Sequence, residues 1–169
     1  GATDQPNKRK IHKDIMPRLG GLAIFIGVIA GYLYLNPQSM YMTNVIIGAF
    51  IIVIIGILDD RYTLQARYKF LGQLVAAIVV ASSGLLIEKF TIPFFDTVQL
   101  DYFSYPVTVL WIVAVTNAIN LIDGLDGLAA GVSSIAMTSI LIMAFADSQL
   151  LVVALCVILI GSTLGFLVH

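Results

Sequence analysis

Six long apolar runs constrain the fold of this chain more than any other feature of its sequence. Each run is close to the length that a membrane-spanning helix needs, about 20 residues. The runs are continuous rather than alternating, which argues against a β-barrel, and 59% of the residues are apolar while 11% are charged. We predict an all-α, polytopic transmembrane helical bundle of about six spans, near residues 19–35, 43–58, 70–87, 106–122, 128–146 and 150–169.

The basic residues predict how these spans are oriented. Eight of the nine Lys and Arg residues either precede the first run or lie between the second and the third. Positively charged loops stay on the cytoplasmic side of a membrane. We therefore expect residues 1–18 to form a cytoplasmic basic segment and residues 19–169 to form the transmembrane domain. The loop near residues 90–103 is then external, and its aromatic residues predict a short hairpin or an interfacial loop.

Two amides and two carboxylates follow one another at intervals of three near the end of the fourth run: Asn117, Asn120, Asp123 and Asp126. On a helix this spacing gives one broad polar face. Amide and carboxylate oxygens suit Mg²⁺. The alternative is a helix end, where Asp caps the next helix and Gly supplies the turn. Capping does not account for the two amides inside an apolar run.

A pair of adjacent carboxylates, Asp59 and Asp60, closes the second apolar run, and Arg61, Arg67 and Lys69 follow. Carboxylates beside a membrane-spanning run are costly and often mark a site. The alternative is an interfacial charge cluster that ends the helix. By the alternation of six spans, this pair and the 117–126 cluster lie on the same, cytoplasmic face, which supports a single site.

The amino-terminal segment contains His12, Lys13 and Arg18 among its basic residues. It is either a polybasic anchor on anionic lipid or a cationic group that holds phosphates. Glycine pairs in the first and last runs, Gly27 with Gly31 and Gly161 with Gly165, are small-residue motifs that favour close helix packing. They also permit a homodimer.

Three patterns, which together cover the chain in order, resemble a known family. The first runs Pro-Asn-x-Arg-Lys-x-His-x-x-x-x-Pro-Arg-x-Gly-Gly from Pro6, and the second is the acid doublet with Lys69 nine residues after Asp60. The third runs Asn-x-x-Asn-x-x-Asp-Gly-x-Asp-Gly-Leu-Ala-x-Gly from Asn117. They resemble the polyprenyl-phosphate N-acetylhexosamine-1-phosphate transferases of glycosyltransferase family 4, and the first pattern looks more like the N-acetylglucosamine branch.

This resemblance implies a bacterial, multi-pass plasma-membrane enzyme whose active site faces the cytoplasm. Its substrates would be a UDP-N-acetylhexosamine and undecaprenyl phosphate. It would move N-acetylhexosamine-1-phosphate, most often N-acetylglucosamine-1-phosphate, to the lipid and release UMP, the first membrane step of a cell-wall or surface glycopolymer. The cofactor would be Mg²⁺, with Mn²⁺ as the alternative.

The same resemblance implies roles for individual residues. Asn120 would ligate the metal, and Lys69 would hold the lipid phosphate or the diphosphate. Asp59 and Asp60 would position or deprotonate the acceptor. Asp123 and Asp126 would contact the nucleotide or support its loop. Asn117, His12, Lys13 and Arg18 would bind substrate, with Lys13 reaching the phosphates.

Members of this family are longer than this chain, so we expect a fragment that begins after the family's first span and ends before a further acidic motif. A catalytically incomplete membrane fragment is therefore one alternative. An ion-coupled transporter is the other, although transporters carry their polar residues near the midplane of the membrane. The short juxtamembrane basic cluster gives no support for nucleic-acid binding.

Overall fold

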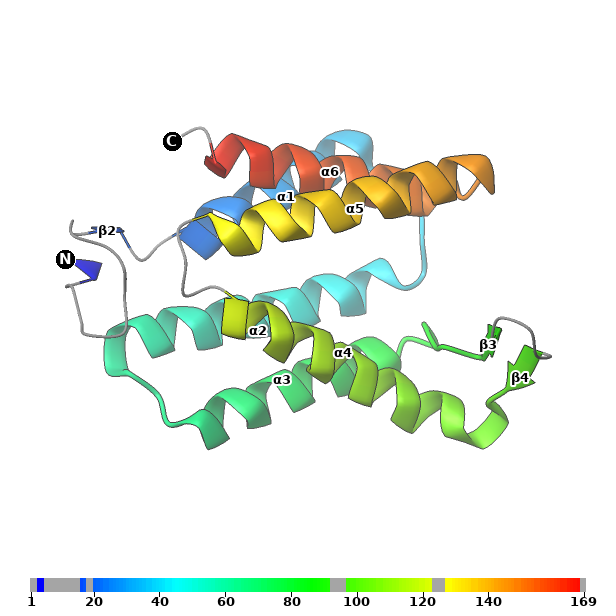
Figure 1. Ribbon diagram of the computed structural model, residues 1–169, viewed down its shortest axis with the longest axis horizontal. Helices are drawn as coiled ribbons and strands as arrows, with labels where there is room; N and C mark the ends of the chain where they lie inside the picture. Colours follow the sequence, from blue (N-terminus) through cyan, green and yellow to red (C-terminus); the bar gives the residue numbers. More distant parts are fainter. Residues whose placement is uncertain (1–2, 5–15, 18–19, 92–96, 123–126, 168–169) are drawn as a thin grey trace. The chain divides into compact units, whose positions relative to one another are not determined.

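The computed structural model describes residues 3–4, 16–17, 20–91, 97–122 and 127–167. Within these ranges the chain is mainly helical (Figure 1), with two short strand pairs and a 3₁₀ turn, η1 (Asp101–Phe103). Strand β1 (Thr3–Asp4) pairs antiparallel with β2 (Met16–Pro17). The helices are α1 (Gly20–Leu35), α2 (Met42–Tyr62), α3 (Ala66–Ala81), α4 (Ser104–Ile122), α5 (Leu128–Ala146) and α6 (Leu150–Leu167).

The predicted all-α membrane bundle is confirmed, because each described helix coincides with one of the predicted apolar runs. Four segments are long and apolar enough to cross a membrane: Met42–Tyr62, Asp101–Ile122, Leu128–Ala146 and Leu150–Leu167. Helix α1 is apolar but has 16 residues. At 1.5 Å per residue it extends about 24 Å, which is shorter than the hydrocarbon core of about 30 Å.

Two helix boundaries differ from the sequence-based expectation. Helix α2 continues to Tyr62, so the acid doublet lies inside its last turns instead of following it. Helix α3 ends at Ala81, and the prediction that this run stays helical to residue 87 is wrong. Ser82 Oγ donates to the Val79 carbonyl and Ser83 Oγ to the Val80 carbonyl, each at 2.7 Å. Such local hydroxyl bonds compete with continuation of the helix.

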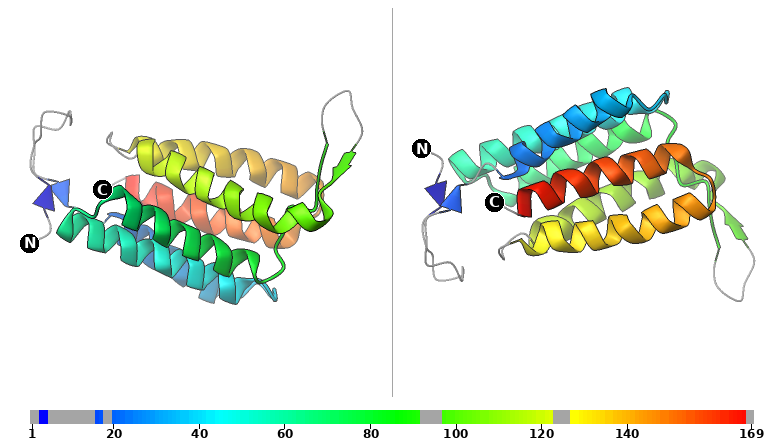
Figure 2. Two further views of the ribbon diagram at one scale, coloured as in Figure 1. Left: turned by 90° about the horizontal axis from the view of Figure 1, so that it is seen from below. Right: turned by 90° about the horizontal axis from the view of Figure 1, so that it is seen from above.

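The first of two compact units contains α1, α5 and α6 with the last part of α2 and the end of α4. Helix α6 packs against both α5 and α1, and Figure 2 shows it lying between them. A Cβ atom built on Gly27 would lie 2.9 Å from Ser162 Oγ, and one built on Gly31 would lie 2.9 Å from Ile158 Cγ2. The expected close packing at this glycine pair is confirmed.

The second glycine pair behaves differently. A Cβ atom built on Gly161 or on Gly165 would meet no atom within 4 Å in the described part of the chain. Helix α6 therefore contacts α1 through Ser162 and Ile158 rather than through its own glycines. Small residues allow two helices to approach each other only on the face where the partner lies.

The second unit consists of residues 40–55 and 64–118. Asn44 Nδ2 donates to the Val79 carbonyl at 3.1 Å, and a Cβ atom on Gly48 would lie 2.6 Å from Val80 Cγ2. Further along, Gly72 lies directly against the side chain of Ile55. The beginning of α2 therefore packs on the end of α3, which makes these two helices antiparallel neighbours.

A hairpin precedes α4 in the second unit. Strand β3 (Lys89–Thr91) pairs antiparallel with β4 (Thr97–Gln99), with Phe90 opposite Val98. The amide of Leu100 donates to the Glu88 carbonyl at 2.8 Å and closes the base of the hairpin. The hairpin expected near residues 90–103 is confirmed, and Tyr102 beside it is 97% exposed. Its external location stays a prediction.

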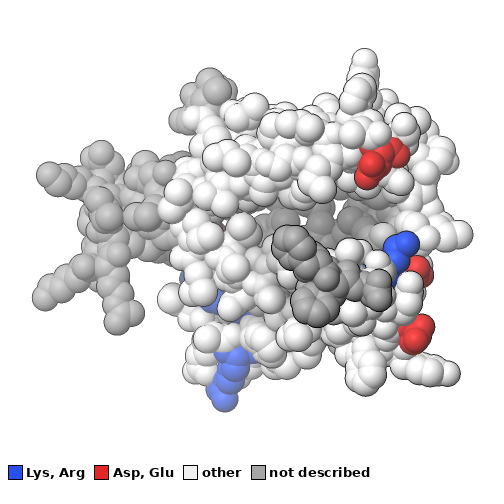
Figure 3. Space-filling view, turned by 45° about the vertical axis from the view of Figure 1, so that its right-hand side comes forward, with Lys and Arg blue, Asp and Glu red and all other residues white. Residues whose placement is uncertain are grey.

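Small side chains dominate the interior of the described residues. The buried apolar residues include five alanines, and no large side chain is completely buried. Large apolar side chains such as Leu110, Trp111 and Phe145 point outward. This distribution suits a lipid environment, where the hydrophobic effect does not drive helices together and close backbone approach does. On the face in Figure 3, acidic and basic side chains are few.

Candidate functional site

Charged side chains in the described helices lie only at helix ends. Asp59, Asp60 and Arg61 occupy the last turn of α2, and Arg67 and Lys69 occupy the first turn of α3. Helices α1, α4, α5 and α6 contain no Asp, Glu, Lys or Arg. An ion at the centre of a membrane-spanning helix is costly. The charges are therefore concentrated where the chain leaves the apolar zone between α2 and α3.

The acid doublet is not explained by the way α2 ends. Termination uses the backbone: the amide of Thr63 donates to the Asp59 carbonyl at 2.8 Å, and Thr63 has a φ of 51°. The carboxyl end of a helix carries partial negative charge, so carboxylates there are unfavourable. Both Asp59 and Asp60 are nevertheless half-buried at this end. This placement favours a functional role over an interfacial charge cluster that merely stops the helix.

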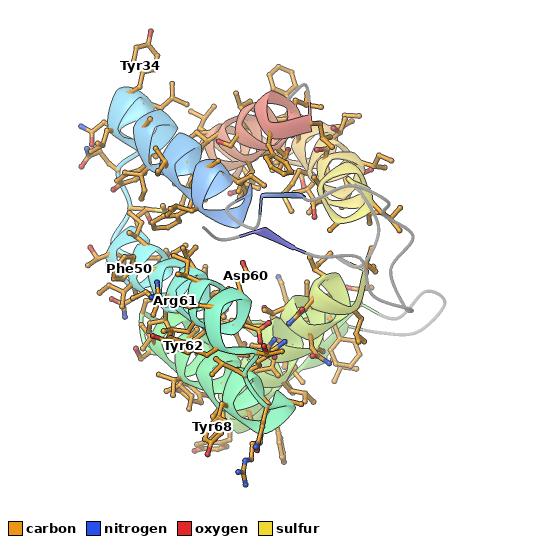
Figure 4. The ribbon with its side chains drawn as sticks, turned by 90° about the vertical axis from the view of Figure 1, so that its left-hand side faces the viewer. Tyr34, Phe50, Asp60, Arg61, Tyr62 and Tyr68 are labelled. Atoms are coloured by element: carbon orange, nitrogen blue, oxygen red, sulfur yellow. The ribbon has the colours of Figure 1, made fainter. Side chains whose placement is uncertain are left out.

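Successive side chains at this end diverge. Adjacent helical residues are rotated by about 100°, and Figure 4 shows Asp60, Arg61 and Tyr62 leaving α2 in different directions. Arg61 and Tyr62 are exposed, while Asp60 is half-buried. Asp59 and Asp60 are adjacent on the same helix, so the same rotation points their carboxylates in different directions.

Lys69 marks the other side of the α2–α3 connection. It is half-buried in the first turn of α3, whereas Arg67, two residues earlier, is exposed. The amino end of a helix carries partial positive charge, which disfavours a lysine and attracts anions. A cation and a helix amino end placed together suit a phosphate. The first turn of α3 is therefore the described segment best suited to hold one.

Asn117 and Asn120 lie in the last two turns of α4 and share one face of that helix. Both side chains are exposed, and neither has a hydrogen-bond partner among the described residues. An unpaired amide in apolar surroundings is unfavourable. The N-cap of α5 is Gly127, at φ 66°, so neither amide caps that helix. Capping therefore does not account for the two amides.

The predicted site residues divide into three groups. Asp59, Asp60 and Asn120 fall within the same compact unit, and Lys69 and Asn117 belong to the other. The remaining predicted residues lie outside the described part of the chain: His12, Lys13, Arg18, Asp123 and Asp126.

The side-chain oxygens of Asp59, Asp60 and Asn120 are of the kind that Mg²⁺ prefers. Carboxylate and amide oxygens are hard ligands, and Mg²⁺ keeps several waters and shares substrate phosphates, so it needs few protein ligands. Among the described residues there is no cluster of three His, Cys, Asp or Glu side chains that would hold a metal. Of the predicted site residues that the structure describes, Asn120, Asp59 and Asp60 belong to one compact unit.

An apolar groove lies between α3 and α4 and has a volume of about 350 Å³. Sequence reasoning missed it, because the groove depends on how two helices pack. It begins on α3 at Phe70, the residue after Lys69. Its lining is Phe70, Leu74, Ile78, Tyr105, Pro106, Val109, Leu110 and Val113.

Gln73 is a second residue that sequence reasoning missed. Its side chain is 5% exposed, and its Oε1 atom is buried without a hydrogen-bond partner among the described residues. Buried polar atoms are nearly always paired, so an unpaired one calls for an explanation. A lone carboxamide within the apolar stretch that follows Lys69 was the signal available in the sequence.

Comparisons with known proteins identify the family of this chain. The model of glycosyl transferase family 4 matches residues 42–169. The chain is 53% identical, over its whole length and 48% of the relative, to a probable undecaprenyl-phosphate N-acetylglucosaminyl 1-phosphate transferase of Bacillus subtilis. It is 36% identical, over 99% of the chain and 47% of the relative, to a decaprenyl-phosphate N-acetylglucosaminephosphotransferase of Mycobacterium leprae.

A relative with a different sugar is less similar. The chain is 31% identical, over 81% of its length and 42% of the relative, to a phospho-N-acetylmuramoyl-pentapeptide-transferase of Chlorobium phaeobacteroides. No solved structure matches the chain. The chain spans about half the length of the curated relatives it matches.

Proposed function

The chain belongs to glycosyl transferase family 4, and from this premise we propose that the protein transfers N-acetylglucosamine-1-phosphate from a UDP-sugar to a polyprenyl phosphate. The observation that carries the proposal is the combination of Lys69 with the apolar groove that begins at Phe70. A polyprenyl phosphate has an anionic head and a long hydrocarbon tail. These two features of α3 suit the two parts of such a molecule.

The groove follows α3 for two turns. Phe70, Leu74 and Ile78 are spaced by four residues and lie on one side of the helix, a rise of about 12 Å. Every residue along the groove offers mainly carbon atoms, so isoprene units would bury apolar surface there. Lys69, half-buried and one residue before Phe70 along the chain, would bind the phosphate head.

The proposed reaction joins two anions. An oxygen of the lipid phosphate attacks the sugar-linked phosphorus of the UDP-sugar, a new P–O–P linkage forms, and the bond to UMP breaks so that UMP leaves with its electron pair. Catalysis of this kind depends mainly on positioning and charge stabilisation. Lys69 would offset the repulsion between the two substrates.

The acid doublet would position the acceptor phosphate rather than deprotonate it. A phosphate monoester has its second pKa near 6, so it is already mostly dianionic at pH 7. Asp59 and Asp60 would orient this head group through the cations and metal around it. Base catalysis by one of the pair is the second choice.

A bound Mg²⁺, with Mn²⁺ as the alternative, would neutralise phosphate charge. Asn120 would hold the ion through its amide oxygen, together with oxygen donors beyond the described residues. Asn117 would contact the substrate. Asp123 and Asp126 would contact the nucleotide or support its loop, and His12, Lys13 and Arg18 would bind phosphates.

The protein would work at the cytoplasmic face of a bacterial membrane. The basic residues around α2 and α3 support this orientation by the positive-inside rule, and a nucleotide sugar is found in the cytosol. An ion-coupled transporter is less well supported, because the described helices have charged side chains only at their ends, whereas transporters bind their ions near the midplane.

The test is UMP release by membranes that contain the full-length gene product, given undecaprenyl phosphate and Mg²⁺. We expect turnover with UDP-N-acetylglucosamine and little with UDP-N-acetylmuramoyl-pentapeptide. Lys69→Met should abolish most of the activity, while Lys89→Met, in the exposed strand β3, serves as the matched control. The proposal would be overturned if UMP were released from neither nucleotide sugar.

A further inference from the structure

We propose that Gln73 is a positioning residue for Lys69: when a phosphate group is bound, the buried Oε1 atom of Gln73 accepts a hydrogen bond from the Lys69 ammonium and directs that ammonium toward the phosphate. The proposal rests on the proposed role of Lys69 in phosphate binding. It assigns a function to a side chain that the family patterns in the sequence do not include.

The first support is the burial of Gln73 without a partner. The residue is 5% exposed, and within the described part of the chain its Oε1 atom is buried with no hydrogen bond. A buried acceptor that has left water and gained no donor is destabilising. A protein that needs this side chain only for packing would be more stable with an apolar residue of the same size. The amide is therefore expected to meet a donor during the working cycle.

The second support is the position of Lys69 on the same side of α3. Gln73, Ala76, Ala77 and Ala81 form the buried side of this helix. Lys69 extends that side by one turn toward the amino end, about 6 Å along the axis. Helical side chains lean toward the amino end of their helix, so the Gln73 side chain lies over the turn that contains Lys69.

The third support is the lack of a rival donor on the neighbouring part of α2. Gly48 lies against Ala76 and Val80, and Ile55 lies against Gly72. These contacts bracket the position of Gln73. Residues 48–55 of α2 read Gly-Ala-Phe-Ile-Ile-Val-Ile-Ile, so this stretch offers no polar side chain. Lys69 is the nearest charged donor along α3 itself.

The chemistry of an ammonium group fits this arrangement. It has three N–H donors, and a phosphate at the amino end of α3 would use one or two of them. A hydrogen bond to Gln73 would use another and restrict a side chain that otherwise has large rotamer freedom. The expected benefit is tighter binding of the phosphate head group, so the effect should appear in affinity and KM before it appears in kcat.

The experiment measures binding of undecaprenyl phosphate to the purified full-length protein in detergent by native mass spectrometry. Gln73→Met keeps the size of the side chain and removes the amide. We expect the dissociation constant to rise about tenfold, as for the loss of a charge-assisted hydrogen bond. The melting temperature should stay the same or rise, since an unpaired buried acceptor is gone. Gln149→Met, at the exposed α5–α6 turn, is the matched control.

A double-mutant cycle with Lys69→Met separates positioning from a structural role. If Gln73 acts through Lys69, Gln73→Met will have no further effect on binding once Lys69 is replaced. An equal loss in both backgrounds, or no loss in the unsubstituted protein, overturns the inference. The binding assay needs no nucleotide sugar. If the Gln73 and Lys69 substitutions are coupled in lipid binding but the protein releases no UMP, the proposed transferase function is refuted and the inference about Gln73 is supported. Failure of the unsubstituted protein to bind the lipid overturns both.

Discussion

Two buried polar groups in apolar helices differ in one respect that separates packing from function. Ser134 on α5 and Thr163 on α6 are each 8% exposed, and their hydroxyls hydrogen-bond to each other at 2.8 Å. Gln73 on α3 is as deeply buried, but its Oε1 atom has no hydrogen-bond partner in the ranges that the structure describes. The hydroxyl pair is complete and holds two helices together. The glutamine has a buried acceptor that no described donor reaches in this structure, which agrees with the proposed hydrogen bond to Lys69 in the phosphate-bound state.

The helix pairs around these groups show the same contrast. The turn between α5 and α6 has a single charged residue, Asp147. The α2–α3 connection and the helix turns next to it contain Asp59, Asp60, Arg61, Arg67 and Lys69. Both carboxylates and both cations at the start of α3 stand at the helix ends that disfavour them. This unfavourable placement is what supports the proposal that the α2–α3 connection binds a charged substrate.

The largest expected effect follows from replacing one acid of the doublet. Asp60→Asn should lower UMP release at least roughly 100-fold, about 2.7 kcal/mol of activation free energy, because the charge that orients the acceptor is lost. Binding of UDP-N-acetylglucosamine, measured by calorimetry, should persist. Asp147→Asn in the α5–α6 turn should have no effect. Near-normal turnover in Asp60→Asn would mean that the carboxylate at the α2–α3 connection matters no more for activity than the one in the α5–α6 turn.

The next effect concerns the exposed amides of α4. Asn120→Ala should raise the Mg²⁺ concentration for half-maximal activity at least roughly tenfold, because a ligand to the ion is lost. Asn44→Ala removes a donor that bonds the Val79 carbonyl and Ser82 Oγ, so it should lower thermal stability and leave the Mg²⁺ titration unchanged. Identical metal titrations for both variants would argue against ligation by Asn120.

A smaller effect tests the glycines that pack α1 on α6. Gly31→Ala would place a methyl group 2.9 Å from Ile158 Cγ2, and such overpacking should destabilise the protein by about 1–3 kcal/mol. Gly161→Ala meets no described atom and should be neutral or stabilising by up to about 1 kcal/mol through helix propensity. Thermal unfolding in detergent distinguishes them. Equal losses would show that both glycines pack closely.

The smallest effect concerns the hydroxyl pair itself. Thr163→Val keeps the shape of the side chain and removes its bond to Ser134, which should cost about 0.6 kcal/mol. UMP release should not change, because the pair lies in a structural interface. A large loss of activity with normal stability would mean that a satisfied polar pair also serves the reaction, and the distinction from Gln73 would fail.

Much of the fold was predictable because each apolar run is a local property of the sequence. Within a membrane an apolar run of this length forms a helix, because its backbone groups must hydrogen-bond to one another. The hairpin near residues 90–103 was also local. The end of α3 was not predictable from hydropathy, because it coincides with local hydroxyl bonds of Ser82 and Ser83 and with a positive φ of 90° at Gly84.

The site was predictable in part for the same reason. Four residues of the candidate site are polar at positions within or beside apolar runs, where polar side chains are energetically unfavourable. They are Asp59, Asp60, Asn117 and Asn120, and this unfavourable placement can be recognised from the sequence alone. The groove and Gln73 were not visible, because a groove exists only when two helices pack and a buried amide is unusual only when its surroundings are known.

The sequence by itself determined the helices, their membrane setting and the polar residues of the candidate site, because these depend on neighbours along the chain. Only the tertiary structure decided which glycine pair packs, where a hydrocarbon tail would fit beside Lys69, and which buried polar group lacks a partner. Those properties depend on atoms from distant segments, and spacing along one chain does not specify how such atoms meet.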